Sequence, residues 1–365
     1  MSWSPQQSGA IQAVKKWHRD KSAPQVFRLF GFAGTGKTTI AQEIAKEIKG
    51  RVIFGAFTGK AALVLRTKGC DGASTIHSMI YKLDEDGPIP KFVINKDSGV
   101  SSASLIIIDE CSMVDDELGA DLLSFGTKVL VLGDPEQLPP VNGTGFFTSQ
   151  EPDVLLTEIH RQAADNPIIR MSMEIREGRK LQLGMYGDSK VITRARVGQK
   201  AVLAADQVLI GLNRTRRTFN EKIRALKGIE SPYPVPGDRL VCLKNDKELS
   251  LLNGGIWTAR RTAFPDENGI IELPVTTEDD PLVTYPVDVK VREQFFLGTE
   301  DQLHWTDKKG FQEFNYGYAL TVHKSQGSQW NNVMVFDESK AFREDARRWL
   351  YTAVTRAAER VTVVI

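Results

Sequence analysis

The chain has 365 residues, of which 41% are hydrophobic and 25% charged, the balance of an ordinary globular protein. Its formal net charge of +1 neither supports nor excludes a nucleic-acid partner, so any basic surface must be local. Its three cysteines form no C-x-x-C pair, which argues against a zinc site. No apolar run approaches the roughly 20 residues of a membrane span, so we expect a soluble cytoplasmic protein.

Strands and helices alternate through the first part of the chain. Ser4 and Pro5 are typical of a helix start, so an opening helix is predicted over 4–20. Apolar β-branched runs then alternate with helical patterns, which favours a parallel sheet buried on both faces. The predicted strands are 26–30, 51–57, 104–108 and 128–132, and the predicted helices are 38–49 and 59–67. We expect a first lobe over 1–150, with a β-hairpin in a short insertion at 81–103.

A second cycle of the same kind begins near residue 155. Its predicted strands are 207–211 and 332–336, and its predicted helices are 213–226 and 341–355. Between them, Pro, Gly, Asp and Thr become frequent and the segments are short and alternating, which indicates a small inserted barrel over 236–310. We therefore expect a second lobe over 151–235 and 311–365.

A glycine-rich loop follows the first predicted strand and precedes the helix predicted over 38–49. A run G-F-A-G-T-G-K-T in this context is typical of a P-loop, whose backbone N–H groups face phosphate oxygens. Lys37 supplies a positive charge to the β- and γ-phosphates, and the Thr38 hydroxyl is placed for Mg²⁺. The predicted nucleotide-binding residues of this segment are Gly31, Gly34, Thr35, Gly36, Lys37, Thr38 and Thr39.

Two further strands end in polar residues. L-I-I-I-D-E places Asp109 at the carboxyl edge of the sheet, where it would hold Mg²⁺, and Glu110 beside it to polarise the attacking water. Gln137 follows the next strand in G-D-P-E-Q-L-P-P-V and could sense the γ-phosphate, although an ordinary turn explains the pattern equally well.

Two arginines, Arg161 and Arg356, follow apolar segments of the second lobe. A guanidinium that reaches a triphosphate stabilises the charge that develops during its cleavage. Spacing alone is equally compatible with a pair of surface arginines.

Six motifs occur in order: G-F-A-G-T-G-K-T, I-I-D-E-C-S-M-V, G-D-P-E-Q-L-P-P-V, L-T-E-I-H-R-Q, T-V-H-K-S-Q-G-S-Q and Y-T-A-V-T-R-A. They resemble the motifs of superfamily 1 helicases, in particular the RecD-like and Dda-like branch, superfamily 1B. The resemblance implies an α/β fold of two RecA-like parallel-sheet lobes, with a β-hairpin pin in the first and an SH3-like β-barrel in the second. It also implies a motor that uses ATP and Mg²⁺ to move 5′ to 3′ on single-stranded DNA.

The resemblance assigns further roles to individual residues. Gln7 matches the adenine-contacting glutamine, Gly327 lies in the loop that closes on the nucleotide, and Arg161 and Arg356 match the arginines donated by the second lobe. Phe92 is the candidate residue of the strand-separating pin. The implied DNA contacts are Thr58, Lys60, Thr75, His77, Thr321, His323 and Lys324. By residue type alone, His77 and His323 could equally be capping or core histidines.

Three functions remain open on this basis. The first is a monomeric ATP-driven motor that separates duplex DNA, with single-stranded DNA and single-strand/duplex junctions as substrates and replication or recombination proteins as partners. The second is a translocase that remodels protein–DNA complexes without extensive unwinding. The third is a P-loop switch or small-molecule kinase with no nucleic-acid partner, which would not need a second α/β lobe.

Overall fold

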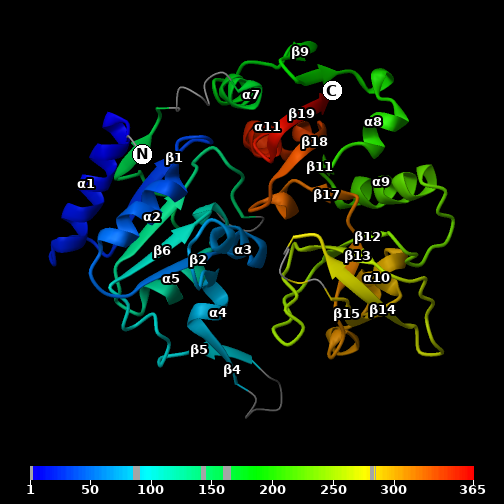
Figure 1. The fold of residues 1–365 in the computed structure, drawn as a ribbon, viewed down its shortest axis with the longest axis horizontal. Helices are drawn as coiled ribbons and strands as arrows, with labels where there is room; N and C mark the ends of the chain where they lie inside the picture. The colour runs from blue at the N-terminus through cyan, green and yellow to red at the C-terminus, as the bar shows by residue number, and fades with distance from the viewer. Residues whose placement is uncertain (1–2, 85–90, 141–144, 159–165, 280–282, 284) are drawn as a thin grey trace. The chain divides into compact units, whose positions relative to one another are not determined.

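The computed structural model describes residues 3–84, 91–140, 145–158, 166–279, 283 and 285–365. The chain divides into two compact units, which are considered separately. The first unit consists of Met1–Arg179 and Arg347–Thr355, and the second of Lys180–Ala346 and Arg356–Ile365. Figure 1 shows that each contains a sheet with helices packed against it.

The first unit contains a six-stranded sheet in the order β3-β2-β6-β7-β1-β8, in which every neighbouring pair is parallel. Its strands are β1 (Val26–Gly31), β2 (Val52–Ala56), β3 (Ser74–Thr75), β6 (Leu105–Asp109), β7 (Val129–Gly133) and β8 (Val154–Leu156). All residues of β6 and β7 are buried, as expected for central strands covered on both faces. The predicted buried parallel sheet is therefore confirmed.

Helices cover both faces of this sheet. They are α1 (Pro5–Arg19), α2 (Lys37–Glu47), α3 (Gly59–Thr67), α4 (Ile76–Ile80), α5 (Asp116–Leu123) and the 3-10 helix η1 (Cys111–Met113). The first unit also includes α7 (Pro167–Arg176) and α11 (Ala346–Val354) from Arg347 onward. Successive side chains of a strand point to opposite faces. In β6, Leu105 and Ile107 pack with α1, α2 and α3, whereas Ile106 and Ile108 pack with α4 and α5.

The opening helix begins where its cap residues predict. Ser4 is the N-cap of α1 and Pro5 occupies its first turn. The Ser4 hydroxyl accepts a hydrogen bond from the Gln7 backbone N–H, and the Gln7 side chain accepts one from the Ser4 backbone N–H. This reciprocal capping box satisfies two N–H groups that the helix itself leaves without partners.

The first sheet extends past residue 150, at which the sequence analysis ends the first lobe. In β8, Val154 pairs with Leu29 and Leu156 with Gly31 of β1. This strand has only three residues, too few for a periodic pattern. Arg347–Thr355 also groups with the first unit, although we expected it in the second lobe. The division into lobes over 1–150 and over 151–235 with 311–365 remains a prediction.

Two short strands lie in the insertion predicted at 81–103. They are β4 (Tyr81–Asp84) and β5 (Lys91–Ile94), which pair antiparallel with Leu83 opposite Phe92. The segment between them lies outside the described residues. Tyr81, Leu83, Phe92 and Ile94 share one face of the pair, because alternate residues of a strand point the same way.

The second unit contains a six-stranded sheet in the order β17-β11-β18-β19-β10-β9, parallel except between β9 and β10. Its strands are β9 (Gly184–Tyr186), β10 (Ser189–Ile192), β11 (Gln207–Ile210), β17 (Ala319–Thr321), β18 (Trp330–Phe336) and β19 (Ala357–Val364). Its helices are α8 (Gln199–Leu203), α9 (Asn213–Leu226), η2 (Arg194–Arg196), η5 (His323–Ser325) and η6 (Ser339–Asp345). The prediction of a second parallel sheet is confirmed for five of its six strands.

An antiparallel five-stranded sheet, β15-β14-β13-β12-β16, interrupts the second unit. Its elements are β12 (Arg239–Cys242), β13 (Ile256–Ala259), β14 (Ile270–Thr277), β15 (Val287–Arg292), β16 (Phe314–Tyr316), α10 (Gln294–Leu297), η3 (Glu300–Gln302) and η4 (Trp305–Lys308). β16 lies beyond residue 310, at which we expected the insertion to end. It pairs with β12 along the whole of its length, with Cys242 opposite Phe314.

The helix predicted over 341–355 is interrupted. A 3-10 helix, η6, ends at Asp345, and α11 begins at the next residue. Arg343 has a φ of 48°, in the left-handed region that a right-handed helix excludes. The motif Y-T-A-V-T-R-A therefore starts inside a separate helix, and Arg356 follows that helix by two residues.

A buried ion pair ties α9 to the inserted sheet. Arg224 donates from Nε and Nη2 to the two carboxylate oxygens of Asp238 at 3.0 and 2.9 Å, and Asp238 also accepts from the Tyr318 hydroxyl at 3.0 Å. The side chains of Arg224 and Asp238 are only 6% and 0% exposed.

We expect Asp238→Ala to lower the free energy of unfolding by about 3–5 kcal/mol, because it leaves the Arg224 charge buried without its partner. Urea denaturation of the full chain measures the change. The matched control is Glu272→Ala, which removes an exposed ion pair with Lys290 and should cost less than about 1 kcal/mol. Equal losses in the two variants would contradict the buried pair's importance.

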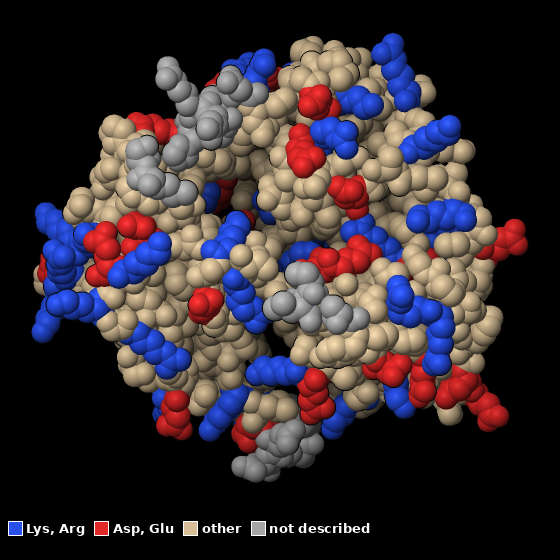
Figure 2. All heavy atoms as spheres, viewed as in Figure 1, with Lys and Arg blue, Asp and Glu red and all other residues tan. Residues whose placement is uncertain are grey.

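Surface charge is mixed rather than gathered. On the face drawn in Figure 2, Lys and Arg side chains are interspersed with Asp and Glu. The described residues of that face therefore form no single large basic patch, in keeping with the net charge of +1. Among the described residues, no helix is both long enough and apolar enough to span a bilayer.

Candidate nucleotide and nucleic-acid site

The glycine-rich loop joins the end of β1 to the start of α2, as a P-loop requires. Gly34 and Gly36 have φ values of 81° and 82°. Only glycine adopts this left-handed conformation without strain, so the loop can turn its N–H groups inward. Gly36 is also the N-cap of α2, whose N-terminal backbone N–H groups and dipole favour an anion.

Lys37 lies folded over this loop. Its ammonium donates to the carbonyl oxygens of Gly31 at 2.6 Å and Phe32 at 3.1 Å. Thr35 is 1% exposed and donates from its hydroxyl to the same Phe32 carbonyl at 2.9 Å. The positive charge is thus held at the mouth of the loop by neutral acceptors, and phosphate oxygens are stronger acceptors of the same kind.

Thr38 and Asp109 meet beneath the loop. The Thr38 hydroxyl donates to Oδ2 of Asp109 at 2.8 Å, and the Glu110 backbone N–H donates to Oδ1 at 2.8 Å. Asp109 is 9% exposed, and burial raises its pKa, with the neighbouring Glu110 charge as a further cause. A cation beside this carboxylate would offset its desolvation cost.

These residues fit a Mg²⁺ ion. Mg²⁺ prefers oxygen ligands and is usually held by one or two protein oxygens together with waters and substrate phosphates. The described residues contain no group of three or more His, Cys, Asp or Glu that could hold a metal by themselves. Thr38 and Asp109 therefore suit a nucleotide-linked ion rather than a closed protein site.

Glu110 occupies a strained backbone position. Its φ of 52° and ψ of 46° lie in the left-handed region, which costs a non-glycine residue about 1–3 kcal/mol. Strain of this kind persists where the surrounding structure holds a residue in place, and it concentrates at functional sites. Glu110 follows directly after the buried end of β6, beside the Thr38–Asp109 contact.

Gln7 lies against the P-loop rather than in solvent. It is 3% exposed, and its Nε2 donates to the Thr35 carbonyl at 3.0 Å while its Oε1 serves the capping box of α1. Gln6, which the sequence analysis does not single out, accepts from the backbone N–H groups of Thr157 and Glu158 at 2.8 Å each. Arg161, a few residues further on, lies outside the described residues.

The loop after β7 is held by α11. Gln137 is 8% exposed, and its Oε1 is buried without a hydrogen-bond partner among the described residues. On either side of it, Asp134 accepts from the Tyr351 hydroxyl at 2.7 Å and the Leu138 N–H donates to the Thr352 hydroxyl at 2.9 Å. The sequence analysis quotes the motif containing Tyr351 and Thr352 but assigns them no role.

In the second unit, Arg356 contacts the loop that contains Gly327. It is 5% exposed, and its Nη1 donates to the Ser328 carbonyl at 3.4 Å. Gly327 has a φ of 75°, which explains a glycine at this turn. Two residues chosen from separate motifs are therefore brought together within this unit.

Two protein families match the chain. The AAA domain family matches residues 3–196, more than half of the chain, and the UvrD-like helicase C-terminal domain matches residues 316–364. The ATP-dependent RecD2 DNA helicase of Deinococcus radiodurans is 28% identical over 375 residues, covering 91% of this chain and 46% of that protein. The chain belongs to the AAA domain family.

A further relative and a solved structure are similar over most of this chain. The RecD subunit of the RecBCD enzyme of Mycobacterium tuberculosis is 27% identical over 394 residues, covering 92% of this chain and 66% of the subunit. Bacteroides Pif1 bound to single-stranded DNA has the same fold, with a TM-score of 0.57 and 18% identity over 99% of this chain and 92% of that one. The chain spans less than half the length of the first relatives it matches: 46% of the RecD2 helicase and 32% of a conjugal transfer protein TraA from Sinorhizobium fredii.

Some of the predicted DNA contacts in the first unit also cap helices. Thr58 and Thr75 are the N-caps of α3 and α4, and their hydroxyls accept from the backbone N–H groups two or three residues into each helix. Lys60 is 7% exposed. His77 is exposed, and its ring lies 4.4 Å from the Phe92 ring in an edge contact. Their roles in DNA binding remain predictions.

The second-unit contacts lie around η5. The Thr321 hydroxyl accepts from the Lys324 N–H at 3.3 Å, and the Lys324 ammonium donates to Asn253 Oδ1 at 2.7 Å. Burial lowers the pKa of both Lys324 and His323. Asn253 belongs to the inserted segment and lies 71 residues from Lys324 along the chain.

By residue type, Tyr316 and Tyr318 could either stack on bases or pack in the core, and core packing is the expected role. Both are buried, at 5% and 7% exposure, and pack in the hydrophobic core of the second unit. The Tyr316 hydroxyl donates to the Pro232 carbonyl at 2.7 Å. The core alternative is therefore correct for both.

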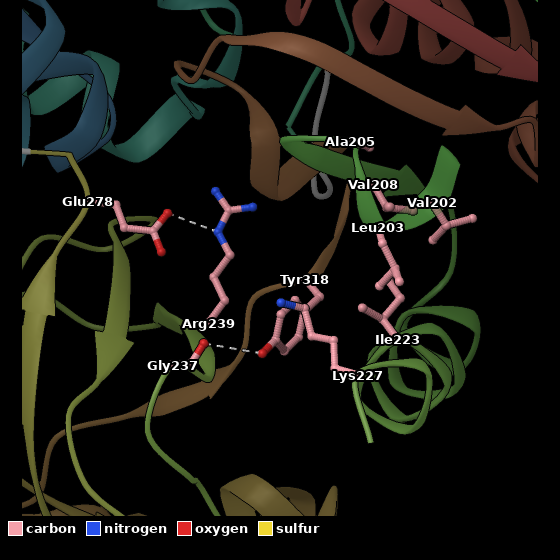
Figure 3. Close-up of a pocket in the computed structure, with 10 residues that line it drawn as sticks. All are labelled: Val202, Leu203, Ala205, Val208, Ile223, Lys227, Gly237, Arg239, Glu278 and Tyr318. Atoms are coloured by element: carbon pink, nitrogen blue, oxygen red, sulfur yellow. Dashed lines mark hydrogen bonds and ion pairs between the residues drawn. The ribbon is translucent and has the colours of Figure 1, made fainter. Parts of the chain in front are cut away.

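A cavity of about 170 Å³ lies elsewhere in the second unit, between α8, α9, β11 and β12. Figure 3 shows its apolar wall with Lys227 and Tyr318 at one side and the Arg239–Glu278 pair at the other. Arg239 Nε lies 3.1 Å from the Glu278 carboxylate. None of the residues that line this cavity is a predicted nucleotide-binding or catalytic residue. The cavity is therefore separate from the candidate nucleotide site.

Proposed function

We propose that this chain is a DNA-dependent ATPase that moves 5′ to 3′ along single-stranded DNA and separates strands at single-strand/duplex junctions. The observation that carries the proposal is the buried Thr38–Asp109 contact beneath a P-loop with two left-handed glycines. That contact brings a hydroxyl and a carboxylate to the edge of the sheet at which the Lys37 ammonium also lies. Together they form a site suited to a nucleoside triphosphate and its metal.

Each residue of the first unit has a separable task in this proposal. Lys37 binds the β- and γ-phosphates, and the loop N–H groups orient them. Thr38 and Asp109 would hold Mg²⁺, which when bound neutralises charge on the transferring phosphoryl group. Glu110 orients a water and accepts its proton, and Gln137 relays the presence of the γ-phosphate to the loop that it occupies.

Two arginines would complete the reaction. Arg356, and Arg161 by resemblance alone, would supply guanidinium groups to the charge that develops on the γ-phosphoryl group. We propose the hydroxyls and lysines at 58–77 and 321–324 as phosphate contacts on the DNA strand, which carry no sequence information. The five-stranded sheet would be the SH3-like barrel, and the β4–β5 pair the pin. Binding of replication or recombination proteins, action as a monomer and a cytoplasmic location belong to the same proposal.

The decisive experiment is unwinding of forked duplexes that carry either a 5′ or a 3′ single-stranded tail, with ATP and Mg²⁺. We expect strand separation from the 5′ tail and ATP hydrolysis that poly-dT stimulates. Stimulated hydrolysis without unwinding from either tail would indicate a translocase that remodels protein–DNA complexes. Hydrolysis that ignores poly-dT would contradict the DNA motor, and preference for a 3′ tail would contradict the direction.

Phe92 is the residue of the β4–β5 pair best placed to act on a duplex end. It is 60% exposed, although an aromatic ring normally seeks burial, and Leu83 opposite it is 49% exposed. Its edge contact with His77 joins the strand pair to α4. An exposed ring of this kind can stack on a base without sequence preference.

We expect Phe92→Ala to reduce the unwinding rate about 10-fold while DNA-stimulated hydrolysis stays within about twofold of wild type, given about 1–3 kcal/mol per stacked base. Stopped-flow unwinding and steady-state hydrolysis measure the two quantities. Phe264→Ala is the matched control, because Phe264 is 66% exposed in the second unit and has no proposed role. Parallel loss of both activities in Phe92→Ala would make Phe92 structural instead.

A further inference from the structure

Tyr351 joins three segments of the first unit at one hydroxyl group. It lies on α11, is 1% exposed, and donates to Asp134 Oδ2 at 2.7 Å. The Tyr351 hydroxyl oxygen also accepts from the Ala33 backbone N–H of the P-loop at 3.1 Å. A single side-chain atom therefore connects the phosphate-binding loop, the loop after β7 and the helix that leads into Arg356.

The chemistry of the contact favours this direction of donation. Burial raises the pKa of Tyr351 well above its ordinary value, so the phenol keeps its proton. Burial also raises the pKa of Asp134, and the Lys37 charge and the Tyr351 hydroxyl oppose that rise. A hydrogen bond to a buried carboxylate is stronger than one between neutral groups, so this contact holds its geometry firmly.

Two neighbouring contacts keep the same helix on the same loop. Arg347 Nη2 lies 2.9 Å from the Glu136 carboxylate, and the Thr352 hydroxyl accepts from the Leu138 N–H at 2.9 Å. Gln137 stands between these anchor points in sequence. Any change in the position of α11 must therefore move the segment that carries Gln137.

Helix α11 also reaches the outer side of the P-loop. Arg347 donates to the Arg176 carbonyl, and the Arg176 guanidinium lies 3.7 Å from the centre of the Phe32 ring. Phe32 precedes Ala33 in the loop. The helix thus contacts the P-loop directly through the Tyr351 hydroxyl and indirectly through Arg176, whose carbonyl accepts from Arg347 and whose guanidinium lies over Phe32.

We infer that Tyr351 is a positioning residue of the ATPase: its hydroxyl fixes the P-loop, the 134–138 loop and α11 relative to one another, and thereby sets where Gln137 and Arg356 stand during hydrolysis. This inference depends on the proposed ATP hydrolysis. Arg356 belongs to the second unit, but it follows the last residue of α11 by only two positions, so the helix constrains its backbone.

The test is Tyr351→Phe in the full chain, which keeps the buried ring and removes only the hydroxyl. Loss of a group that orients catalytic residues typically costs about 10- to 100-fold. We expect kcat for poly-dT-stimulated hydrolysis to fall by about that factor. The KM for ATP, and the stoichiometry and affinity of a fluorescent ATP analogue, should stay close to wild type because Lys37 and the loop remain.

Tyr318→Phe is the matched control. It also removes a buried phenol that donates to a carboxylate, that of Asp238 at 3.0 Å, but it lies in the core of the second unit. We expect it to retain kcat even if it lowers the thermal stability as much as Tyr351→Phe does. A fall in kcat of similar size in both variants, or a kcat within about twofold of wild type in Tyr351→Phe, would overturn the inference.

A second variant approaches the contact from the other side and covers the case in which Tyr351→Phe folds poorly. Asp134→Asn keeps an acceptor for the phenol but removes the charge, so we expect a smaller loss of kcat. In the double variant, kcat should be no lower than in Tyr351→Phe alone, because both changes act on one contact. Losses that multiply would overturn the inference. Absence of hydrolysis in the wild-type chain would instead contradict the proposed function.

Discussion

We expect Lys37→Ala to reduce kcat for ATP hydrolysis about 10²- to 10³-fold while the first unit stays folded. The Lys37 ammonium is the positive charge at the mouth of the P-loop, where the carbonyls of Gly31 and Phe32 hold it. Its removal deprives the developing phosphoryl charge of a preorganised partner in a site with little water. Steady-state hydrolysis with saturating poly-dT measures the loss.

The structure indicates that this variant folds. The Lys37 side chain bonds only to backbone carbonyls at the loop surface, and Ala is a better helix former than Lys at the start of α2. Lys46→Ala is the matched control, because Lys46 lies on the same helix with a side chain that is 74% exposed. Hydrolysis that persists in Lys37→Ala, with Lys46→Ala unchanged, would contradict the P-loop as the catalytic site.

We expect Arg356→Ala to retain nucleotide binding but to lose about 10³- to 10⁵-fold in kcat, the magnitude for a guanidinium that stabilises charge in the transition state. The Arg356 side chain is buried and already contacts the loop that carries Gly327 through the Ser328 carbonyl. Binding of a fluorescent ATP analogue and steady-state hydrolysis separate the two effects. A loss confined to KM would mean that Arg356 only helps to bind the nucleotide.

Arg356→Lys distinguishes geometry from charge. A lysine keeps the positive charge but lacks the planar fork of donors, so we expect it to recover only a small part of the activity. Arg360→Ala is the control, since Arg360 lies four residues after Arg356 and is exposed on β19. Near-normal turnover in Arg356→Ala would refute a catalytic role for the second unit.

Much of the fold follows from local patterns. The runs around β1, β6 and β7 are continuous and apolar, and buried parallel strands require that composition. The cap of α1 and the exact bounds of α3 and α9 follow from short-range rules of helix formation. The first sheet's edge strands β3 and β8 were not predicted, because two or three residues carry no period.

The nucleotide site divides in the same way. Lys37, Thr38 and Asp109 are predictable because loop, strand and helix occur at fixed spacings that the chemistry of a triphosphate requires. The strain at Glu110 and the burial of Gln7 against the Thr35 carbonyl carry no sequence signal. Both depend on neighbours that are dozens of residues away or on backbone angles that most residues avoid.

The amino-acid sequence by itself determined the two α/β halves, the P-loop with its acidic strand end, and the resemblance to superfamily 1B helicases. Each follows from short contiguous sequence patterns: the spacing of apolar residues, the positions of glycines and the positions of charged residues. Only the tertiary structure decided that α11 belongs with the first unit and that Tyr351 meets both Ala33 and Asp134. Those partners lie more than 200 residues from Tyr351 along the chain, and such contacts arise from packing of whole elements rather than from any local preference.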